Sequence, residues 1–191
     1  MSTTANKLAL PLAPLLARLE LDAPGQALLQ DAADVPRAIA LLIEGDRLHD
    51  ALRLIAHALP KREAVWWACM CARLRTEPTA QASLEAAENW VRKPDETTRR
   101  GAMAAAEAGA FRHAEDWAAV AAFWSGGSMS PEGQPAVEPA DNLTGVAVAS
   151  AIILAAMRQS PERAPARMQQ FLGSARDIAG GGAGRLAPEE P

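Results

Sequence analysis

Leu143-Thr-Gly-Val-Ala-Val-Ala-Ser-Ala-Ile-Ile-Leu-Ala-Ala-Met157 is the most apolar stretch of this 191-residue chain, and it decides the fold. It contains no charged residue, yet it is shorter than the roughly 20 residues that a membrane-spanning helix needs. A helix that is apolar on all sides is buried when it belongs to a globular protein. The stretch therefore predicts a buried core helix and no membrane span.

Composition extends the helical prediction to the whole chain. Hydrophobic residues make up 49% and charged residues 22% of the sequence, which is typical of a globular protein. The chain has 44 alanines, no tyrosine and only 4% aromatic residues. Alanine is the best helix former, whereas strands favour β-branched and aromatic side chains. We therefore predict an all-α fold.

Periodic apolar segments alternate with Pro, Gly and Asp along most of the sequence. Short connections between helices favour antiparallel hairpins, and we find no repeat at a fixed period. The prediction is an antiparallel helical bundle or a short stack of helix hairpins, with about eight or nine helices. The predicted helices are 12–21, 37–44, 47–59, 61–75, 79–92, 95–108, 114–124, 143–158 and 161–179, with a short helical turn at 26–33.

Four residues carry predictions about helix ends. Gly45 is predicted to end the second of these helices in a left-handed conformation, and Asp46 to cap the next one. Asn142 or Thr144 is predicted to cap the apolar helix.

Composition also divides the chain. We expect a flexible N-terminus over residues 1–10, a single all-α domain over residues 11–179, and a disordered Gly- and Pro-rich tail over residues 180–191. Within the domain, residues 125–142 are rich in glycine and proline and cannot continue a helix. A long loop is expected there.

The charge balance excludes one class of partner. The chain has 19 Lys and Arg against 23 Asp and Glu, a net charge of −4 at pH 7. Nucleic-acid-binding proteins carry a basic excess, so we predict no nucleic-acid partner. The apolar residues 8–17 have the length of a signal-peptide core, but two prolines interrupt them and Arg18 and Glu20 follow. We expect a cytoplasmic protein, with secretion as the alternative.

No set of residues points to a reaction. The motifs GxSxG, GxxxxGK[ST], GxGxxG and HExxH are all missing from the sequence. His49 and His57 would lie about 12 Å apart along one helix, too far to share a metal ion. Cys69 and Cys71 would point about 200° apart on a helix and are predicted to be small core residues. We predict no catalytic, cofactor-binding or metal-binding residue.

The segment Pro60-Lys-Arg-Glu-Ala-Val-Trp-Trp67 breaks a local rule, because two cations stand in the first turn of a helix, where the macrodipole favours anions. One explanation is structural: Arg62 can stack on the indole of Trp66 one turn later, while Glu63 suits the dipole. The other is a partner-binding surface with Lys61 and Arg62 at its rim. Lys61, Arg62, Glu63 and Trp66 are thus the first candidate interaction surface.

The second candidate lies at the start of the expected loop, at Gly126, Gly127 and Ser128. Consecutive glycines after a helix can form a backbone nest for anions, although a P-loop would need glycines before a helix and a lysine. The segment is either a helix end that leads into a crossover or a docking or gating loop, since long loops in compact domains are often functional.

Three blocks of sequence resemble an uncharacterised bacterial family: Leu59-Pro-Lys-Arg-Glu-Ala-Val-Trp-Trp-Ala68, Ala87-Glu-Asn-Trp-Val91 and Ala122-Phe-Trp-Ser-Gly-Gly-Ser128. The resemblance covers about residues 30–178. The family carries a domain of unknown function and implies a soluble helical protein without an assigned activity. Its association with type VI secretion gene neighbourhoods suggests an accessory or effector-handling role, and it supplies no catalytic residues.

These observations favour a non-enzymatic helical protein-interaction module, an adaptor or chaperone-like accessory factor, with a link to secretion implied by the resemblance. A first alternative is a bundle that binds a small molecule or peptide, or an enzyme with an unrecognised site, in a pocket lined by the five tryptophans, which all fall within residues 66–124. A second alternative is a toxin-neutralising immunity protein, whose acidic surface would suit a basic toxin.

Overall fold

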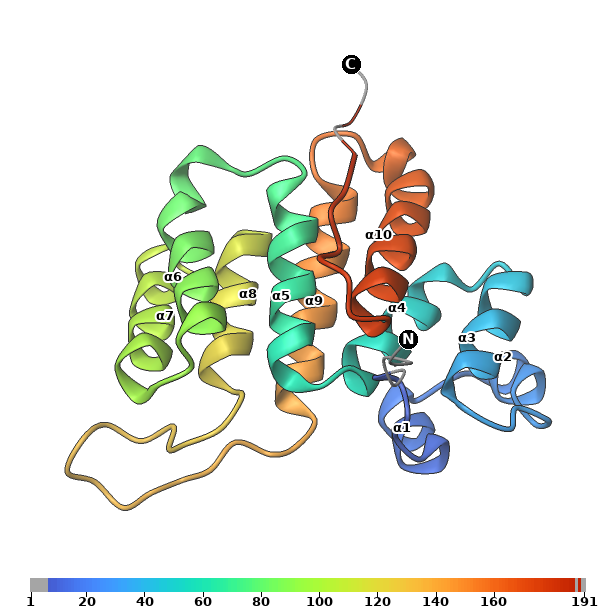
Figure 1. Ribbon diagram of the computed structural model, residues 1–191, viewed down its shortest axis with the longest axis horizontal. Coiled ribbons are helices and arrows are strands. Elements are labelled where there is room, and N and C mark those ends of the chain that lie inside the picture. The colour runs from blue at the N-terminus through green and yellow to red at the C-terminus, as the bar shows by residue number, and fades with distance from the viewer. Residues whose placement is uncertain (1–6, 188, 190–191) are drawn as a thin grey trace, which may run out of the picture.

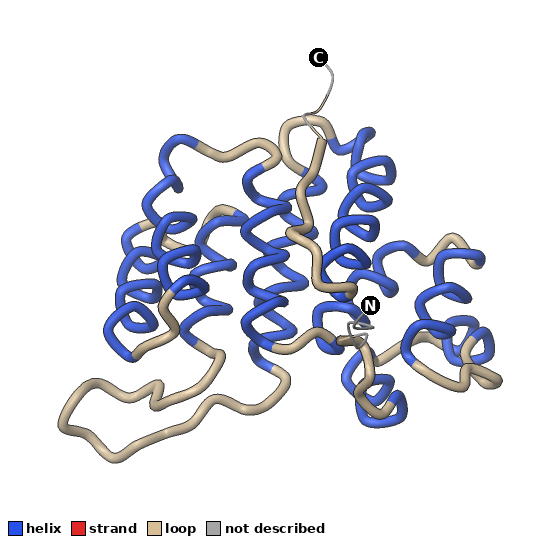
Figure 2. Tube along the Cα trace, viewed as in Figure 1, coloured by secondary structure: helices blue, strands red, loops and turns tan. Residues whose placement is uncertain are grey.

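The computed structural model describes residues 7–187 and residue 189, and this part of the chain is all-α, as predicted (Figures 1 and 2). The described residues form ten α-helices and two short 3-10 turns. The α-helices are α1 (Leu12–Leu19), α2 (Ala23–Leu28), α3 (Val35–Glu44), α4 (Leu48–Ala58), α5 (Lys61–Arg73), α6 (Gln81–Arg92), α7 (Glu96–Ala108), α8 (Ala114–Phe123), α9 (Leu143–Met157) and α10 (Ala164–Ala179); the 3-10 turns are η1 (Pro78–Ala80) and η2 (Pro161–Arg163).

Helix α9 is the core helix that its uniformly apolar sequence predicted. It packs against α4, α5, α8 and α10, and nine of its 15 residues are buried. Helices α6, α7 and α8 form one end of the molecule, and α1, α2 and α3 form the other (Figure 1). Because α9 contacts helices from both halves of the chain, it joins the two ends into one bundle.

Small side chains allow the central helices to approach closely. Ala118, Ala121 and Ala122 of α8 are fully buried, as are Ala147 and Ala151 of α9, and these two helices pack on each other. Helix axes come closer when the side chains between them are small. The alanine content of the sequence is therefore used at helix–helix contacts as well as for helix propensity.

An arginine side chain of α10 binds the C-terminal end of the core helix α9. The side chain of Arg167, which is buried, donates from Nη1 to the carbonyl oxygens of Ala156 (2.9 Å) and Arg158 (2.6 Å) at the C-terminus of α9. A cation there satisfies carbonyls that lack helical partners and complements the negative end of the helix dipole. This contact ties α10 to α9.

Two predictions near the N-terminus were wrong. The helical segment expected at 26–33 is instead helix α2, which begins at Ala23 because Asp22 accepts a hydrogen bond from the Gly25 backbone N–H. Gly45 does not take the left-handed conformation; its φ is −84°, and Asp46 takes it with φ 55°. The end of the Leu28 side chain packs close to Gly45, and a Cβ there would lie 2.7 Å from its Cδ2 atom, so a larger residue would require Leu28 to shift.

The predicted caps of α9 also differ in the structure. Asn142 occupies the N-cap position, but its side chain makes no capping hydrogen bond. The hydroxyl of Thr144 donates to the carbonyl of Trp124 (2.9 Å) and so joins α9 to the end of α8. The first turn of α9 is consequently left without a side-chain cap.

The two ends of the chain are held in place where the structure describes them. Of the expected flexible N-terminus, residues 1–6 lie outside the described residues, while Lys7 donates its backbone N–H to Ala179 (3.1 Å). Of the tail expected to be disordered from Gly180, residues 180–187 run back across α5 and α10 (Figure 1), and residues 188, 190 and 191 lie outside the described residues. The physical reason is a set of side-chain hydrogen bonds that local composition does not reveal.

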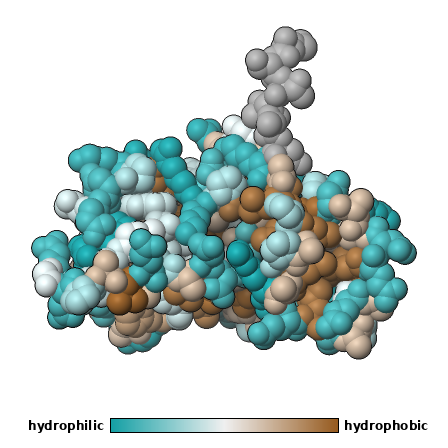
Figure 3. Space-filling view, turned by 90° about the horizontal axis from the view of Figure 1, so that it is seen from below, coloured by the Kyte–Doolittle hydropathy of each residue, from teal (hydrophilic) through white to brown (hydrophobic). Residues whose placement is uncertain are grey.

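The long loop at residues 125–142 is present and projects from the bundle beyond α8 (Figures 1 and 2). Seen from below, hydrophobic side chains gather on the half of the surface nearest α1 to α4, and the opposite half is mostly hydrophilic (Figure 3). None of the described helices combines the length and hydropathy needed to cross a bilayer alone, and α9 with Pro161–Ala179 meets the criterion only as a pair bent by 115°.

Candidate functional site

The first turn of α5 sends neighbouring residues to opposite sides of the helix. Lys61 lines a small pocket with His57 of α4, which we call the His57 pocket. Arg62, Glu63 and Trp66 line a different surface, formed with α6, α10 and the C-terminal residues, which we call the Trp66 face. The structure thus brings three of the four residues of the first candidate surface together, and it places Lys61 elsewhere, because successive helical residues point about 100° apart.

Arg62 does not stack on Trp66 as one explanation of the sequence predicted. Its Nε donates to the carbonyl of Val91 (2.7 Å), in the last turn of α6. Among the described residues, the arginine that lies over an aromatic ring is Arg99, 4.5 Å from the ring centre of Phe123. Arg62 therefore stands unfavourably at the start of α5 but favourably at the C-terminal end of α6, which offsets its cost.

Glu63 holds the N-terminal segment on the Trp66 face. Its carboxylate accepts a hydrogen bond from Lys7 Nζ (2.8 Å). Burial, the largest single influence, raises the pKa of Glu63, but the hydrogen bond and charge of Lys7, a backbone hydrogen bond and the charge of Arg62 together outweigh it, and the pKa is lowered. Glu63 is therefore held as a carboxylate in the folded protein.

The Trp66 face contains two hollows, one on each side of the indole. The first has a volume of about 310 Å³ and the second about 540 Å³. Outside the C-terminal segment, four cations and one acid line them: Lys7, Arg62 and Arg92 in the first hollow, Arg73 in the second, and Glu63. Arg185 and Leu186, which also line the second hollow, belong to the segment itself. Glu63 pairs with Lys7, and Glu88 pairs with Arg73 and Arg92, so the positive excess of the hollows is small.

The C-terminal segment lies between these hollows as a non-helical chain, with positive φ at Gly181 (92°) and Gly184 (68°). Trp66 donates its indole N–H to the carbonyl of Ala183 (2.9 Å), and Ser174 donates its hydroxyl to the carbonyl of Gly184 (2.6 Å). Asp177 accepts the backbone N–H of Gly184 (2.7 Å). Three side chains of α5 and α10 thus bind backbone groups of the segment. The contact depends on two glycines of the segment, because a Cβ would lie 2.1 Å from Asp177 at Gly182 and 2.5 Å from Ile178 at Gly184.

An arginine cluster beyond the second hollow binds an acidic residue of the same segment. Glu189 accepts hydrogen bonds from Arg167 Nε (2.9 Å) and Nη2 (3.1 Å), and Arg75 and Arg163 lie 3.5 and 3.6 Å away. The hydrogen bonds of Arg167 lower the pKa of Glu189. The bidentate geometry is the arrangement by which arginine recognises a carboxylate.

The second candidate segment serves to fix the base of the long loop. Gly127 has φ 67°, and a Cβ there would lie 3.0 Å from Nε of Arg99. Arg99 and Arg100 donate to the carbonyl of Ser128 (2.8 and 3.4 Å). Gly126, Gly127 and Ser128 therefore direct a carbonyl toward cations, the reverse of an anion nest, and none of the three lines the hollows of the Trp66 face.

The five tryptophans do not surround one cavity. Trp67 is fully buried and Trp90 nearly so, and the indole N–H of Trp67 donates to the carbonyl of Phe171 (3.0 Å). Trp117 and Trp124 contact each other edge to face, with ring centres 6.4 Å apart. Trp66 is left as the tryptophan of the two hollows, so the clustering in sequence does not produce a shared pocket in space.

The His57 pocket was not predicted. From the sequence, His57 was a candidate only for metal binding, and its eight-residue spacing from His49 spoke against a shared metal ion. A glycine inside the apolar stretch at position 145 was the available signal, because a Cβ there would lie 2.2 Å from His57 Nδ1. Close approach of another element is a common reason for a glycine in a helix.

The remaining residues with reactive or metal-binding side chains lie apart. Within residues 7–187 and 189, no group of three or more His, Cys, Asp or Glu side chains is arranged to hold a metal ion. Cys69 and Cys71 are buried and unbridged, as predicted, and burial raises the pKa of both thiols.

Comparison with known proteins identifies the family. The model of a family of unknown function, DUF6931, matches residues 38–179. The chain belongs to this family. No curated protein and no solved structure matches it.

The family match includes most of the helices around the two surfaces but not the C-terminal segment. It includes α4 to α10, and with them His57, Lys61, Trp66 and the α10 residues that hold the C-terminal segment. It begins inside α3 and ends at the last residue of α10, so α1, α2 and the C-terminal segment lie outside it. The helices that form the Trp66 face are thus part of the family domain, and the segment that covers it is not.

Proposed function

We propose that the protein is a non-enzymatic interaction module that binds an extended, acidic segment of a partner protein on the Trp66 face. The observation that carries the proposal is the C-terminal segment, whose backbone at Ala183 and Gly184 is bound by Trp66, Ser174 and Asp177. A surface that binds one chain through its backbone groups can bind another that has glycine at the positions of Gly182 and Gly184, where a Cβ would overlap Asp177 and Ile178.

Charge defines the partner's chemistry. Outside the segment, four cations and Glu63 line the two hollows, and Glu88 pairs with two of these cations. The arginines beyond the hollows supply the clearer positive charge and bind Glu189 of the segment. Complementary charge steers association and excludes like-charged partners. A segment with carboxylates near its ends and small or apolar residues between them fits this face.

This chemistry suits an adaptor or chaperone-like factor better than the alternatives. Capture of an extended segment is what a factor that escorts or links other proteins needs, and the secretion-associated role implied by the resemblance would use it. A basic toxin, the partner of an immunity protein, would meet like charge on the Trp66 face.

The proposal is tested by supplying the segment as a separate molecule. A chain ending at Gly180 and a synthetic peptide of residues 180–191 are mixed, and binding is followed by NMR shifts of the Trp66 indole. We expect saturable binding with a Kd of about 1 mM or tighter, since a short intramolecular tether supplies a millimolar effective concentration. Full-length protein should bind the peptide more weakly, because its own segment competes.

Single substitutions test whether the contacts seen in the structure cause the binding of the peptide. Trp66→Phe removes the indole N–H and should weaken binding about fivefold, whereas Trp117→Phe, whose N–H bonds to the nearby Phe111 carbonyl, should not change it. A peptide with Glu189→Lys should lose most of its affinity. If the shortened chain is folded by circular dichroism and does not bind the peptide, the proposal is wrong.

A second measurement covers the case in which the shortened chain does not fold. In the full-length protein, Trp66→Phe should speed amide hydrogen exchange at Gly184, while Trp117→Phe leaves it unchanged. Equal exchange in the two variants would mean that Trp66 does not hold the segment.

A further inference from the structure

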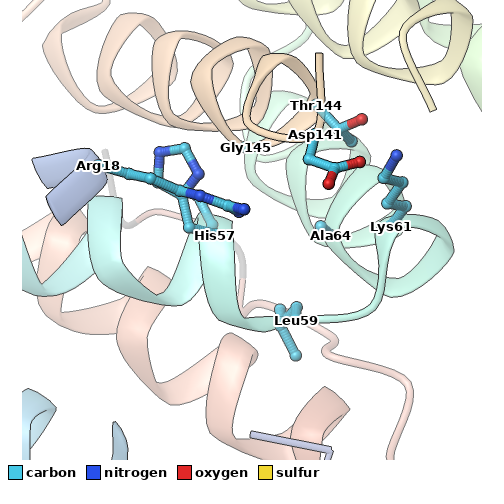
Figure 4. Close-up of a pocket in the computed structure, with 9 residues that line it drawn as sticks. Arg18, His57, Leu59, Lys61, Ala64, Asp141, Thr144 and Gly145 are labelled. Atoms are coloured by element: carbon cyan, nitrogen blue, oxygen red, sulfur yellow. The ribbon is translucent and has the colours of Figure 1, made fainter. Parts of the chain in front are cut away.

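The His57 pocket lies between the beginnings of two helices, on the side of α5 opposite the Trp66 face. It has a volume of about 170 Å³ and is lined by Arg18, His57, Lys61, Asp141, Thr144 and Gly145, among others (Figure 4). Drug-sized ligands occupy pockets of roughly 300 Å³ or more. The space therefore suits a small ligand.

Both helices that begin at the pocket lack side-chain caps. Helix α5 starts after Pro60 and α9 after Asn142, and neither residue makes a capping hydrogen bond. The backbone N–H groups of Thr144 and Gly145 precede the first i to i−4 bond of α9, which Val146 makes to Asn142. Uncapped N–H groups at a helix N-terminus, together with the dipole, favour an anion.

Two cations face the same space. Arg18 comes from α1 and Lys61 from α5, and among the described residues neither has an ion-pair partner within 4.0 Å. Asp141 supplies one negative charge, and Figure 4 shows its carboxylate directed toward the side chain of Lys61. The charged side chains that line the pocket therefore sum to one positive charge. An anion here would also explain why a lysine stands in the first turn of α5.

A buried polar atom at this pocket has no partner. His57 is 8% exposed, and its Nδ1 is the buried side-chain nitrogen or oxygen that lacks a hydrogen-bond partner in the described part of the chain. Its ring rises from α4 toward the first turn of α9 (Figure 4). A buried group without a partner costs on the order of 1 to 3 kcal/mol, so such groups call for an explanation.

We propose that the His57 pocket is a binding site for a small oxyanion, of the size and charge of phosphate or sulfate. The first-turn N–H groups of α9 and the side chains of Arg18 and Lys61 would hold its oxygens, and the imidazole of His57 would donate to it. This site is separate from the Trp66 face and does not depend on its function.

The test uses inorganic phosphate with the full-length protein. Phosphate is titrated at constant ionic strength while the amide signals of Thr144 and Gly145 and the ring signals of His57 are followed by NMR. We expect these signals to shift together and to saturate, and sulfate to compete. O-phosphoserine in a parallel titration distinguishes the source: tighter binding than phosphate indicates a phosphoryl group carried by a larger molecule, and weaker binding indicates the free ion.

Two variants with opposite expected effects make the test sharp. Lys61→Ala should weaken phosphate binding about tenfold, because it removes a charged donor. Asp141→Asn should tighten binding several-fold, because it removes the carboxylate that faces the site. Lys93→Ala is the matched control, since Lys93 is exposed and pairs with Asp95 away from the pocket.

Three results would overturn the proposal. These are shifts that do not saturate, shifts confined to residues outside the pocket, and affinities that Lys61→Ala and Asp141→Asn change no more than Lys93→Ala does. All three variants replace side chains at least partly exposed to solvent, so loss of folding is not expected to confuse the outcome.

Discussion

The His57 pocket and the Trp66 face begin on consecutive residues of one helix and differ in almost every physical respect. The pocket is small, is lined by the ends of helices, and contains a buried imidazole. The face is broad and already crossed by the C-terminal segment. Closely packed surroundings make the pocket sensitive to small changes, whereas long side chains and solvent make the face tolerant of them.

The largest expected effect is on how the free energy of unfolding depends on pH, because His57 of the pocket is buried. Burial, followed by the charges of Arg18 and Arg53, lowers the pKa of His57 to about 4. Between about pH 6.5 and pH 4 the unfolded chain binds a proton at this histidine and the folded chain does not, so stability falls as the pH falls. The loss by pH 4 amounts to about 3 kcal/mol.

Urea unfolding at pH 7 and pH 4 measures this effect. Between pH 7 and pH 4, the free energy of unfolding of the wild type should fall by about 3 kcal/mol more than that of His57→Gln. His49→Gln changes an exposed histidine and should behave as the wild type. Equal losses in the wild type and His57→Gln would show that His57 does not resist protonation in the fold.

The next effect concerns the packing of the pocket. Gly145→Ala should destabilise the protein by about 1 to 2 kcal/mol, because the added Cβ would lie 2.2 Å from His57 Nδ1 and overpacking outweighs the gain in helix propensity. Gly173→Ala in α10 is the matched control, since nothing lies within 4 Å of its Cβ position.

Chemical denaturation distinguishes the two glycine variants. Gly173→Ala should be neutral or stabilising by up to about 1 kcal/mol, through helix propensity alone. If Gly145→Ala is as stable as Gly173→Ala, the pocket is not closely packed around the imidazole and the contrast with the Trp66 face disappears.

The smallest effect is expected on the Trp66 face. Glu63→Gln removes the ion pair with Lys7, whose two side chains are 27% and 32% exposed, and should cost about 0.5 kcal/mol at pH 7. Because the pKa of Glu63 is lowered in the fold, this contribution is present at neutral pH and is lost as the pH falls through the folded pKa. The stabilities of the variant and the wild type should therefore become equal at acidic pH.

Thermal unfolding at low and high salt checks this prediction. The difference between the wild type and Glu63→Gln should shrink at 1 M salt, where a partly exposed pair is screened. Glu44→Gln, at a more exposed pair with Arg37, should have no measurable effect. A cost above about 2 kcal/mol for Glu63→Gln would mean that the face is as closely packed as the pocket.

The sequence predicted the helices well because their signals are local. Proline and aspartate mark helix starts, and the capping box of Asp95 and Thr98 lies at the start of the helix predicted at 95–108. The prediction that Gly45 takes the left-handed conformation failed because Asp46 takes it instead. Gly45 lies against Leu28 of another helix, a contact that the local sequence does not indicate.

The candidate sites were predictable only in part. The sequence drew attention to the two cations at the start of α5, but their separation onto two surfaces follows from where α4, α6 and α10 pack. Gly126 and Gly127 suggested an anion nest, and Arg99, nearly 30 residues earlier in the chain, turned the same loop into a carbonyl contact. Neither the C-terminal segment nor the His57 pocket has a sequence motif, because each is assembled from residues far apart in the chain.

The sequence by itself determined an all-α chain, a core helix at residues 143–157 and no span of a bilayer by a single helix, because helix propensity, capping and apolar length are properties of short stretches. Only the tertiary structure decided which residues share a surface. It placed Lys61 beside His57 and Arg62 beside Val91, and it laid Ala183 on Trp66. These contacts depend on how helices cross and on which side chains meet, and a one-dimensional pattern does not encode that.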